Sequence, residues 1–109
     1  MPENIRYIVV FVTAGSNEEA HKIADLLLER RKAACINIIP GVQSSYWWKG
    51  KIEASTENLL VIKTRASVLS EVIALVKKIH SYEVPEIIAL PIIGGNRDYL
   101  KWIGDEVRA

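Results

Sequence analysis

The chain has 109 residues, of which 50% are hydrophobic and 25% are charged, and this globular composition excludes a disordered chain. Fourteen basic and thirteen acidic residues leave a net charge of +1, too little for the electrostatic footprint of a nucleic-acid or anionic-membrane binder. Cys35 is the one cysteine, which excludes an intramolecular disulfide framework. No signal peptide or membrane span is apparent, so we expect a single cytoplasmic domain over residues 1–109 without nucleic-acid or membrane partners.

The first third of the chain predicts a strand and then a helix. Residues 8–12 are an apolar run rich in β-branched side chains, typical of a strand buried on both faces. Ser16 precedes Glu19 by three residues, the spacing of a capping box at a helix start. Charged residues such as Glu19 are expected to face outward, and the helix is expected to end near residues 30–32. The apolar positions that follow helical spacing are Ala20, Ile23, Ala24, Leu27 and Leu28.

The middle of the chain predicts a long bent hairpin. Residues 33–39 start a strand, and Pro40-Gly41 bends it, because proline lacks a ladder N–H and glycine tolerates unusual dihedral angles. The extended path resumes over residues 42–48. Lys49-Gly50 then forms a tight turn, and residues 51–62 return into the core as the third strand.

The last part predicts a helix, a strand and a short helix. Ser67 is expected to cap the second helix, and Val84-Pro85 prevents this helix from continuing, because a residue before proline avoids helical dihedral angles. Residues 87–93 form the fourth strand, and Pro91 predicts that part of it lies at a sheet edge or at a bulge. Asn96 is expected to cap the last helix. The apolar stripe of the second helix is Leu69, Val72, Val76 and Ile79.

This order predicts an α+β fold, the ferredoxin-like βαββαβ sandwich, with a long bent hairpin and a short C-terminal helix. Both helices of the sandwich lie on one face of a four-stranded antiparallel sheet, so the other face is either solvated or covered by a partner. The segment 34–48 spans roughly 50 Å when extended, at about 3.3 Å per residue, and a domain of this size is only about 35 Å across. The hairpin tip should therefore project from its own subunit.

Three consecutive aromatic residues, Tyr46, Trp47 and Trp48, stand on this projecting hairpin. Burying one large aromatic side chain contributes about 2–3 kcal/mol, and three exposed ones would promote aggregation. We therefore expect neighbouring subunits to cover them, and we assign Trp102 of the last helix to the same subunit contacts. An RNA-binding role for these aromatics is disfavoured, because the aromatic-glycine signature of the RRM is absent.

The sequence resembles the CutA divalent-ion tolerance family nearly from end to end. The resemblance rests on four runs in this order, at residues 33–37, 46–51, 63–65 and 80–86: AACIN, YWWKGK, KTR and HSYEVPE. It implies a ferredoxin-like homotrimer with PII-like architecture, a cytoplasmic location, and an association with tolerance to copper and other divalent cations.

The chain departs from the family pattern where metal ligands are concerned. In family members proposed to bind copper, ligands come from a cysteine in the first strand and from histidines near the end of the second helix. Val12 or Thr13 occupies the cysteine position here, and Ile79 precedes His80. Only His80 can be carried over. Lys32 and Ser81 also depart from the pattern, which has leucine and proline there.

His80, Glu83 and Glu86 are the candidate metal ligands, since imidazole and carboxylate oxygens can share a Cu(II) or another divalent ion. The alternative is that His80 only supports the helix C-terminus. For Cys35 and His21 we favour an inert buried thiol and a solvated surface histidine. We expect no required cofactor, and weak, partly adventitious metal binding.

An enzymatic role is disfavoured, because no orienting group accompanies Cys35 and His80, and no P-loop is present. Two functions remain open. The first is a non-enzymatic homotrimer linked to divalent-cation tolerance. The second is a PII-like regulatory or scaffold trimer that binds a small ligand or a partner protein in a cleft between subunits. The second requires Lys63, Arg65 and Tyr82 to meet His80 and Glu86 in one cleft.

Overall fold

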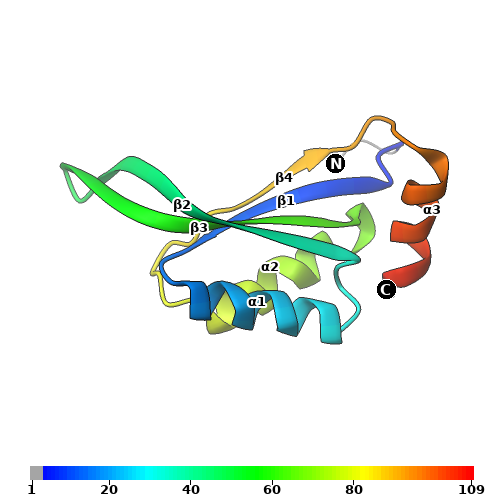
Figure 1. Ribbon diagram of the computed structural model, residues 1–109, viewed down its shortest axis with the longest axis horizontal. Coiled ribbons are helices and arrows are strands. Elements are labelled where there is room, and N and C mark those ends of the chain that lie inside the picture. The colour runs from blue at the N-terminus through cyan, green and yellow to red at the C-terminus, as the bar shows by residue number, and fades with distance from the viewer. Residues whose placement is uncertain (1–3) are drawn as a thin grey trace.

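Four β-strands and three α-helices follow one another in the predicted order in the computed structural model, which describes residues 4–109 (Figure 1). A short 3-10 turn, η1 (Ala66–Val68), precedes the second helix. No helix among the described residues is long and apolar enough to cross a bilayer. The elements are β1 (Tyr7–Ala14), α1 (Asn17–Glu29), β2 (Cys35–Trp48), β3 (Lys51–Arg65), α2 (Leu69–Ile79), β4 (Ile87–Pro91) and α3 (Arg97–Glu106).

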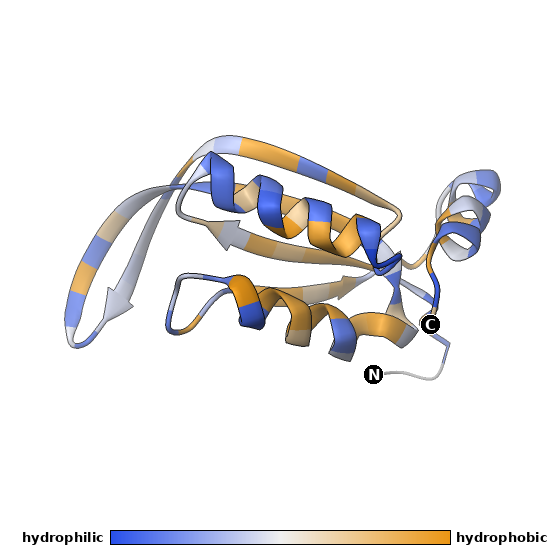
Figure 2. Ribbon diagram, turned by 90° about the horizontal axis from the view of Figure 1, so that it is seen from below, coloured by the Kyte–Doolittle hydropathy of each residue, from blue (hydrophilic) through white to orange (hydrophobic). Residues whose placement is uncertain are grey.

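The strands form one antiparallel sheet in the order β2-β3-β1-β4. This order confirms the predicted βαββαβ sandwich. Helices α1 and α2 lie side by side against one face of the sheet, as Figure 2 shows from the helical side, and α3 packs at the end opposite the hairpin tip (Figure 1). The other face carries no helix, and we call it the open face.

The core lies between the sheet and the two helices, and β1 shows how it is built. Ile8, Val10 and Val12 are fully buried against the helices, whereas Val9 and Phe11 on the open face are only half-buried. The expectation that this strand is buried on both faces is therefore wrong for one chain. Val9 and Phe11 stay half-buried because only one face of the sheet is covered by helices.

The hairpin of β2 and β3 is continuous over 14 and 15 residues. A bulge between Ile39 and Val42 bends it at the predicted place, with Gly41 at φ +73°. Lys49 and Gly50 both have positive φ, at 49° and 80°, which is the backbone of a type I′ turn. Residues 42–57, which we call the arm, extend beyond the helices and stretch the molecule to 43 Å against 27 and 23 Å (Figure 1).

Two predicted helix caps are confirmed, and the third is wrong. Ser16 accepts a hydrogen bond from the Glu19 amide at 3.1 Å, and Asn96 accepts one from the Asp98 amide at 2.9 Å. Ser67 instead lies inside η1, and α2 begins at Leu69 without a side-chain cap. The 3-10 turn η1 leads the chain directly into α2, and no side chain caps either element.

Smaller corrections concern element ends and exposed positions. Strand β4 ends at Pro91 rather than at residue 93, although the Ile92 amide still donates a hydrogen bond to the carbonyl oxygen of Tyr7 at 3.0 Å. Leu28 and Ile79 belong to the apolar stripes of their helices but are exposed. Glu19, expected to face outward, is largely buried beside His80.

The capping difference can be tested with two serine variants. Ser16→Ala should lower the free energy of unfolding by about 1 kcal/mol, because the Glu19 amide loses its hydrogen-bond acceptor. Ser67→Ala is the matched control, since this exposed side chain caps no helix, and it should leave stability nearly unchanged. Urea unfolding at a fixed protein concentration measures both. Equal losses in the two variants would contradict this assignment.

Candidate functional site

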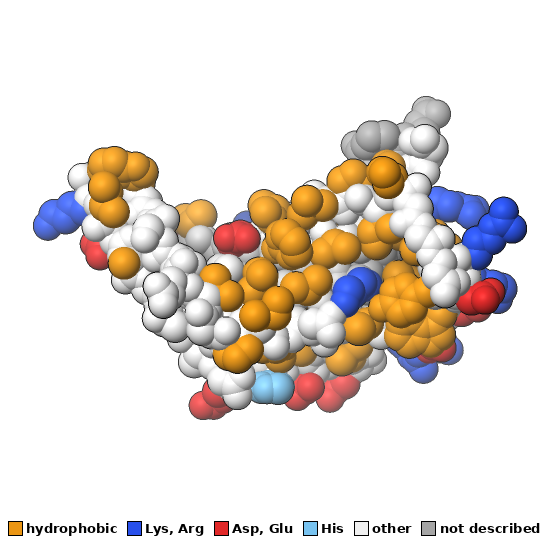
Figure 3. Space-filling view, turned by 45° about the horizontal axis from the view of Figure 1, so that its top comes forward, with side chains coloured by type: hydrophobic (Ala, Val, Ile, Leu, Met, Phe, Trp, Pro, Cys, Tyr) orange, Lys and Arg blue, Asp and Glu red, His pale blue; other side chains and the backbone are white. Residues whose placement is uncertain are grey.

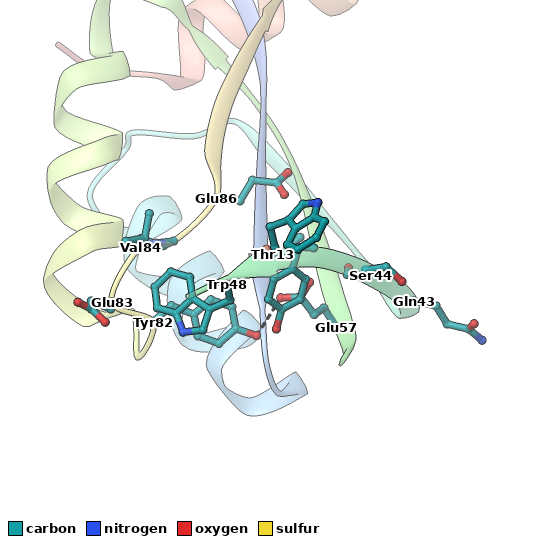
Figure 4. Close-up of a pocket in the computed structure, with 13 residues that line it drawn as sticks. Thr13, Gln43, Ser44, Trp48, Glu57, Tyr82, Glu83, Val84 and Glu86 are labelled. Carbon is teal, nitrogen blue, oxygen red and sulfur yellow. Dashed lines mark hydrogen bonds between the residues drawn. The ribbon is translucent and has the colours of Figure 1, made fainter. Parts of the chain in front are cut away.

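A cavity of about 820 Å³ lies between the arm and the loop 80–86 that follows α2. The arm contributes its three aromatic residues and Glu57, and the loop contributes Tyr82 and Glu86 (Figure 4). The loop can approach the turn after β1 because Gly15 has no side chain. A Cβ atom at Gly15 would lie 3.0 Å from the Tyr82 hydroxyl oxygen.

His80 fixes the start of this loop. Its side chain is 0% exposed, and its Nε2 lies 2.7 Å from the carbonyl oxygen of Thr13. A carbonyl oxygen only accepts, so Nε2 carries the proton. Nδ1 therefore accepts, and the amide of Tyr82 donates to it at 3.0 Å. Both ring nitrogens of His80 are thus used to tie the loop to β1.

Glu19 of α1 completes this connection. Its Oε2 accepts a hydrogen bond from the amide of Ser81 at 3.2 Å. Its Oε1 is buried without a hydrogen-bond partner in the described residues and lies 3.6 Å from Nδ1 of His80. The loop is therefore held by groups from β1 and α1 together.

Glu57 is a nearly buried carboxylate in the cavity wall, with 6% of the residue exposed. The hydroxyl of Tyr82 donates to its Oε2 at 2.8 Å (Figure 4). Burial raises the pKa of Tyr82 well above its ordinary value, and the hydrogen bond to Glu57 adds to the rise. Among residues 4–109 no Lys, Arg or His side chain forms an ion pair with Glu57.

Glu86 brings a second carboxyl group to the same cavity. Burial raises its pKa from the ordinary value, and the negative charge of Glu57 raises it further. Glu83 also borders the cavity, but Figure 4 shows its carboxylate directed away from the other two. Within the part of the chain that is described, no group of three His, Cys, Asp or Glu side chains is arranged to hold a metal ion. His80, Glu83 and Glu86 therefore do not form a metal cluster in one chain.

The other candidate cleft residues lie at the opposite end of the sheet. Strand β1 pairs Tyr7 with Arg65 and Ala14 with Asn58, so Arg65 and the cavity lie at opposite ends of β1. Arg65 lines a second, smaller cavity and reaches the carbonyl oxygen of Val107 at 3.5 Å. One chain thus brings Tyr82 and Glu86 together but leaves Arg65 apart from them.

Lys63 and Cys35 lie opposite each other on the open face. Nζ of Lys63 donates to the side-chain oxygen of Asn37 and lies 4.0 Å from the sulfur of Cys35. Cys35, expected to be a buried thiol, is half-buried. Neither residue borders the large cavity. His21 is exposed, as expected for a surface histidine.

The predicted subunit-contact residues are all exposed in one chain. Trp47 is 72% exposed, and Tyr46, Trp48 and Trp102 are each exposed to a lesser degree. Register places Ile39, Ile88 and Leu90 on the open face beside Val9 and Phe11. Figure 3 shows hydrophobic side chains gathered over the sheet and at the arm.

Sequence reasoning did not single out Glu57, although it is the most buried acidic group of the cavity. A signal was present, since Glu57 directly precedes the buried stretch that begins at Asn58 and continues through Leu60 and Ile62. This signal does not distinguish a buried glutamate from a glutamate at the exposed end of a strand.

Comparison with known proteins agrees with this fold. Residues 8–106 match the family model described as CutA1 divalent ion tolerance protein. The chain is 48% identical over 101 residues to "Protein CutA 1, chloroplastic" of Oryza sativa subsp. japonica, which covers 93% of this chain and 57% of that protein. It is 48% identical over 98 residues to "Divalent-cation tolerance protein CutA" of Archaeoglobus fulgidus, covering 90% and 95%. The chain thus spans little more than half of the plant relative but nearly all of the archaeal one.

Solved structures show the same likeness. The crystal structure of CutA1 from Oryza sativa superimposes with a TM-score of 0.92 at 46% identity, over 95% of each chain. A structure described as the periplasmic divalent cation tolerance protein CutA of Archaeoglobus fulgidus gives 0.91 at 46% identity, over 94% and 99%. Sequence and architecture agree along almost the whole length, and the chain belongs to the CutA1 divalent ion tolerance family.

Proposed function

We propose that the protein works as a non-enzymatic homotrimer that takes part in tolerance to divalent cations. The observation that carries this proposal is the apolar open face, continued by the aromatic arm, which one chain leaves in contact with water. Monomeric proteins rarely expose contiguous apolar patches of this kind. The exposed apolar residues on the open face, the arm and the segment after β4 are Ile39, Tyr46, Trp47, Trp48, Ile52, Ile88, Leu90 and Ile93.

Self-association is the simplest way to cover this surface. Burying Trp47 alone would contribute about 2–3 kcal/mol, and the open face adds several β-branched side chains. A projecting arm reaches a neighbour more easily than it folds back, because its end lies beyond its own helices (Figure 1). The number three and the PII-like arrangement follow from the family resemblance.

The absence of catalysis is supported by the state of the reactive side chains. Both nitrogens of His80 are bound within the fold, so it is not poised as a base for a substrate. Cys35 lies on the open face next to Lys63, and it does not border the cavity. Among the described residues these side chains do not assemble a nucleophile and its base.

Copper does not fit a preformed site in one chain. Copper favours imidazole and thiolate ligands, and here both ring nitrogens of His80 are hydrogen-bonded within the fold while Cys35 lies elsewhere. We therefore assign weak divalent-cation binding to the carboxylates of Glu83 and Glu86, each acting separately because they point in different directions, with His80 holding their loop. The cytoplasmic location stays a prediction, and two relatives carry the words chloroplastic and periplasmic in their descriptions.

A PII-like trimer that binds a small ligand is the second candidate function. It is favoured by the cavity between the arm and the loop 80–86, because the arm is also the expected subunit contact. In this reading Lys63 and Arg65 of one subunit would have to meet Tyr82 and Glu86 of another, since one chain separates them.

The assembly can be tested by charging the arm. Trp47→Glu should dissociate the trimer at micromolar concentration, because a carboxylate cannot be buried in an apolar contact without a partner. His21→Glu is the matched control, since it adds the same charge at an exposed position of α1 away from the open face. Light scattering gives the mass of each variant. A Trp47→Glu protein with the wild-type trimer mass would contradict the role of the arm.

The metal assignment can be tested by calorimetric titration with Cu(II). Wild type and His80→Ala should bind with the same weak affinity, whereas the double variant Glu83→Gln, Glu86→Gln should bind more weakly still. His80→Ala should also lower the free energy of unfolding by about 2 kcal/mol or more, because two buried hydrogen bonds are lost. His21→Ala is the control and should change stability little. Tight Cu(II) binding that disappears in folded His80→Ala would overturn the assignment.

A further inference from the structure

Lys63 is a cation in the middle of the apolar open face. Strand pairing aligns it in one row with Cys35 on β2, Val9 on β1 and Leu90 on β4. Residues that pair directly across an antiparallel sheet point to the same face, so the ammonium group of Lys63 stands among these less polar side chains. It donates to the neutral side-chain oxygen of Asn37 and forms no ion pair with any carboxylate of the described residues.

Lys63 differs in its surroundings from the other half-buried cations. Among the basic residues that the structure describes, only Lys32 and Arg65 are half-buried as well, and the rest are exposed. Lys32 pairs with Glu71 at 3.2 Å, and Arg65 lies at the end of β3 beside exposed residues of the smaller cavity. A neighbouring copy that covers the open face removes water from Lys63, and an unpaired buried charge is costly. Assembly therefore has to supply Lys63 with a carboxylate.

Glu57 is the matching anion. It is the one buried acidic residue in the described chain, with 6% exposed, and no described cation pairs with it. The Tyr82 hydroxyl donates to it at 2.8 Å, but a neutral hydroxyl leaves the charge unbalanced. The cavity beside it is lined by three glutamates and by no lysine, arginine or histidine, and its aromatic walls suit the alkyl stem of a lysine. The cavity is therefore complementary in charge and polarity to an entering lysine side chain.

Lys63 and Glu57 cannot pair within one chain. Both belong to β3, six residues apart, which corresponds to roughly 20 Å at about 3.3 Å per residue, and the even spacing directs them to the same face. An ion pair requires a separation of about 4 Å. The two charges can therefore meet only between copies, and a contact that joins two different surfaces of the same chain is the kind that closes into a ring.

We propose that Lys63 of one subunit enters the cavity of the next subunit and forms an ion pair with Glu57. A neighbouring copy then fills the cavity, and both charges lose water only together. The inference rests on the proposed homotrimer and deepens it, because it names the side chains that join the subunits. The cleft of the second candidate function becomes a composite site, to which one subunit contributes Glu57 with Tyr82 and its neighbour contributes Lys63.

The test follows the exchange of subunits between intact oligomers. Unlabelled and isotope-labelled copies of one variant are mixed, and native mass spectrometry records how fast mixed oligomers appear. Glu57→Gln and Lys63→Met each remove one charge with little change in size, and each leaves the opposite charge unpaired. Either variant should exchange at least about tenfold faster than the wild type, because interface changes act mainly on dissociation. A variant that is folded by circular dichroism but already dissociated gives the same result in a stronger form.

The double variant distinguishes an ion pair from two independent effects. Glu57→Gln combined with Lys63→Met leaves no unpaired charge, so it should exchange no faster than the faster single variant. Independent effects would instead multiply to about a hundredfold or more. Asp25→Asn and Lys77→Met are the matched controls, because both positions are exposed on α1 and α2, and both variants should exchange at the wild-type rate.

Three results would overturn the inference. They are a wild-type exchange rate in either single variant, rate increases that multiply in the double variant, and coupling of Glu57→Gln to Arg65→Gln in place of Lys63→Met. Light scattering of the wild type tests the homotrimer separately. A trimeric wild type without coupling between Glu57 and Lys63 rejects this inference alone, whereas a monomeric wild type rejects the proposed assembly on which it rests.

Discussion

The central constraint on this molecule is a sheet that is apolar on both faces but has helices on only one. Ile8, Val10 and Val12 are fully buried beneath α1 and α2, whereas Val9 and Phe11 of the same strand face the open side. A strand of this composition is typical of a sheet covered on both faces. No described helix of this chain covers that second face, and the arm extends beyond the helices of its own chain (Figure 1).

The loop after α2 depends on this architecture in a second way. Helix α2 ends at Ile79, and the next residue, His80, connects back to the end of β1 through Thr13. Because α1 also contributes Glu19, three elements hold a loop of only seven residues, 80–86. The buried imidazole thus holds the start of the loop in place, and Tyr82 then lies against Glu57 in the wall of the cavity. His80 is a candidate metal ligand in the sequence, and in the fold both of its ring nitrogens form hydrogen bonds to the backbone.

Most of the fold could be predicted because its signals are local. The cap at Ser16, the bend at Pro40-Gly41 and the turn at Lys49-Gly50 are each determined by a few adjacent residues. The prediction for Ser67 is wrong because η1 begins one residue before it and leads into α2 without a side-chain cap. The site was less predictable. Whether Arg65 meets Tyr82 depends on strand pairing, because Glu57, the partner of Tyr82, lies beside one end of β1 and Arg65 pairs with the other.

The burial of Glu57 depends on the fold, so the electrostatic environment of this side chain could not be predicted from the sequence alone. In the sequence it is one of several acids on a polar hairpin, but the fold places it under the Tyr82 hydroxyl and beside Glu86. The pKa of Glu86 is raised first by its burial and then by the negative charge of Glu57 beside it.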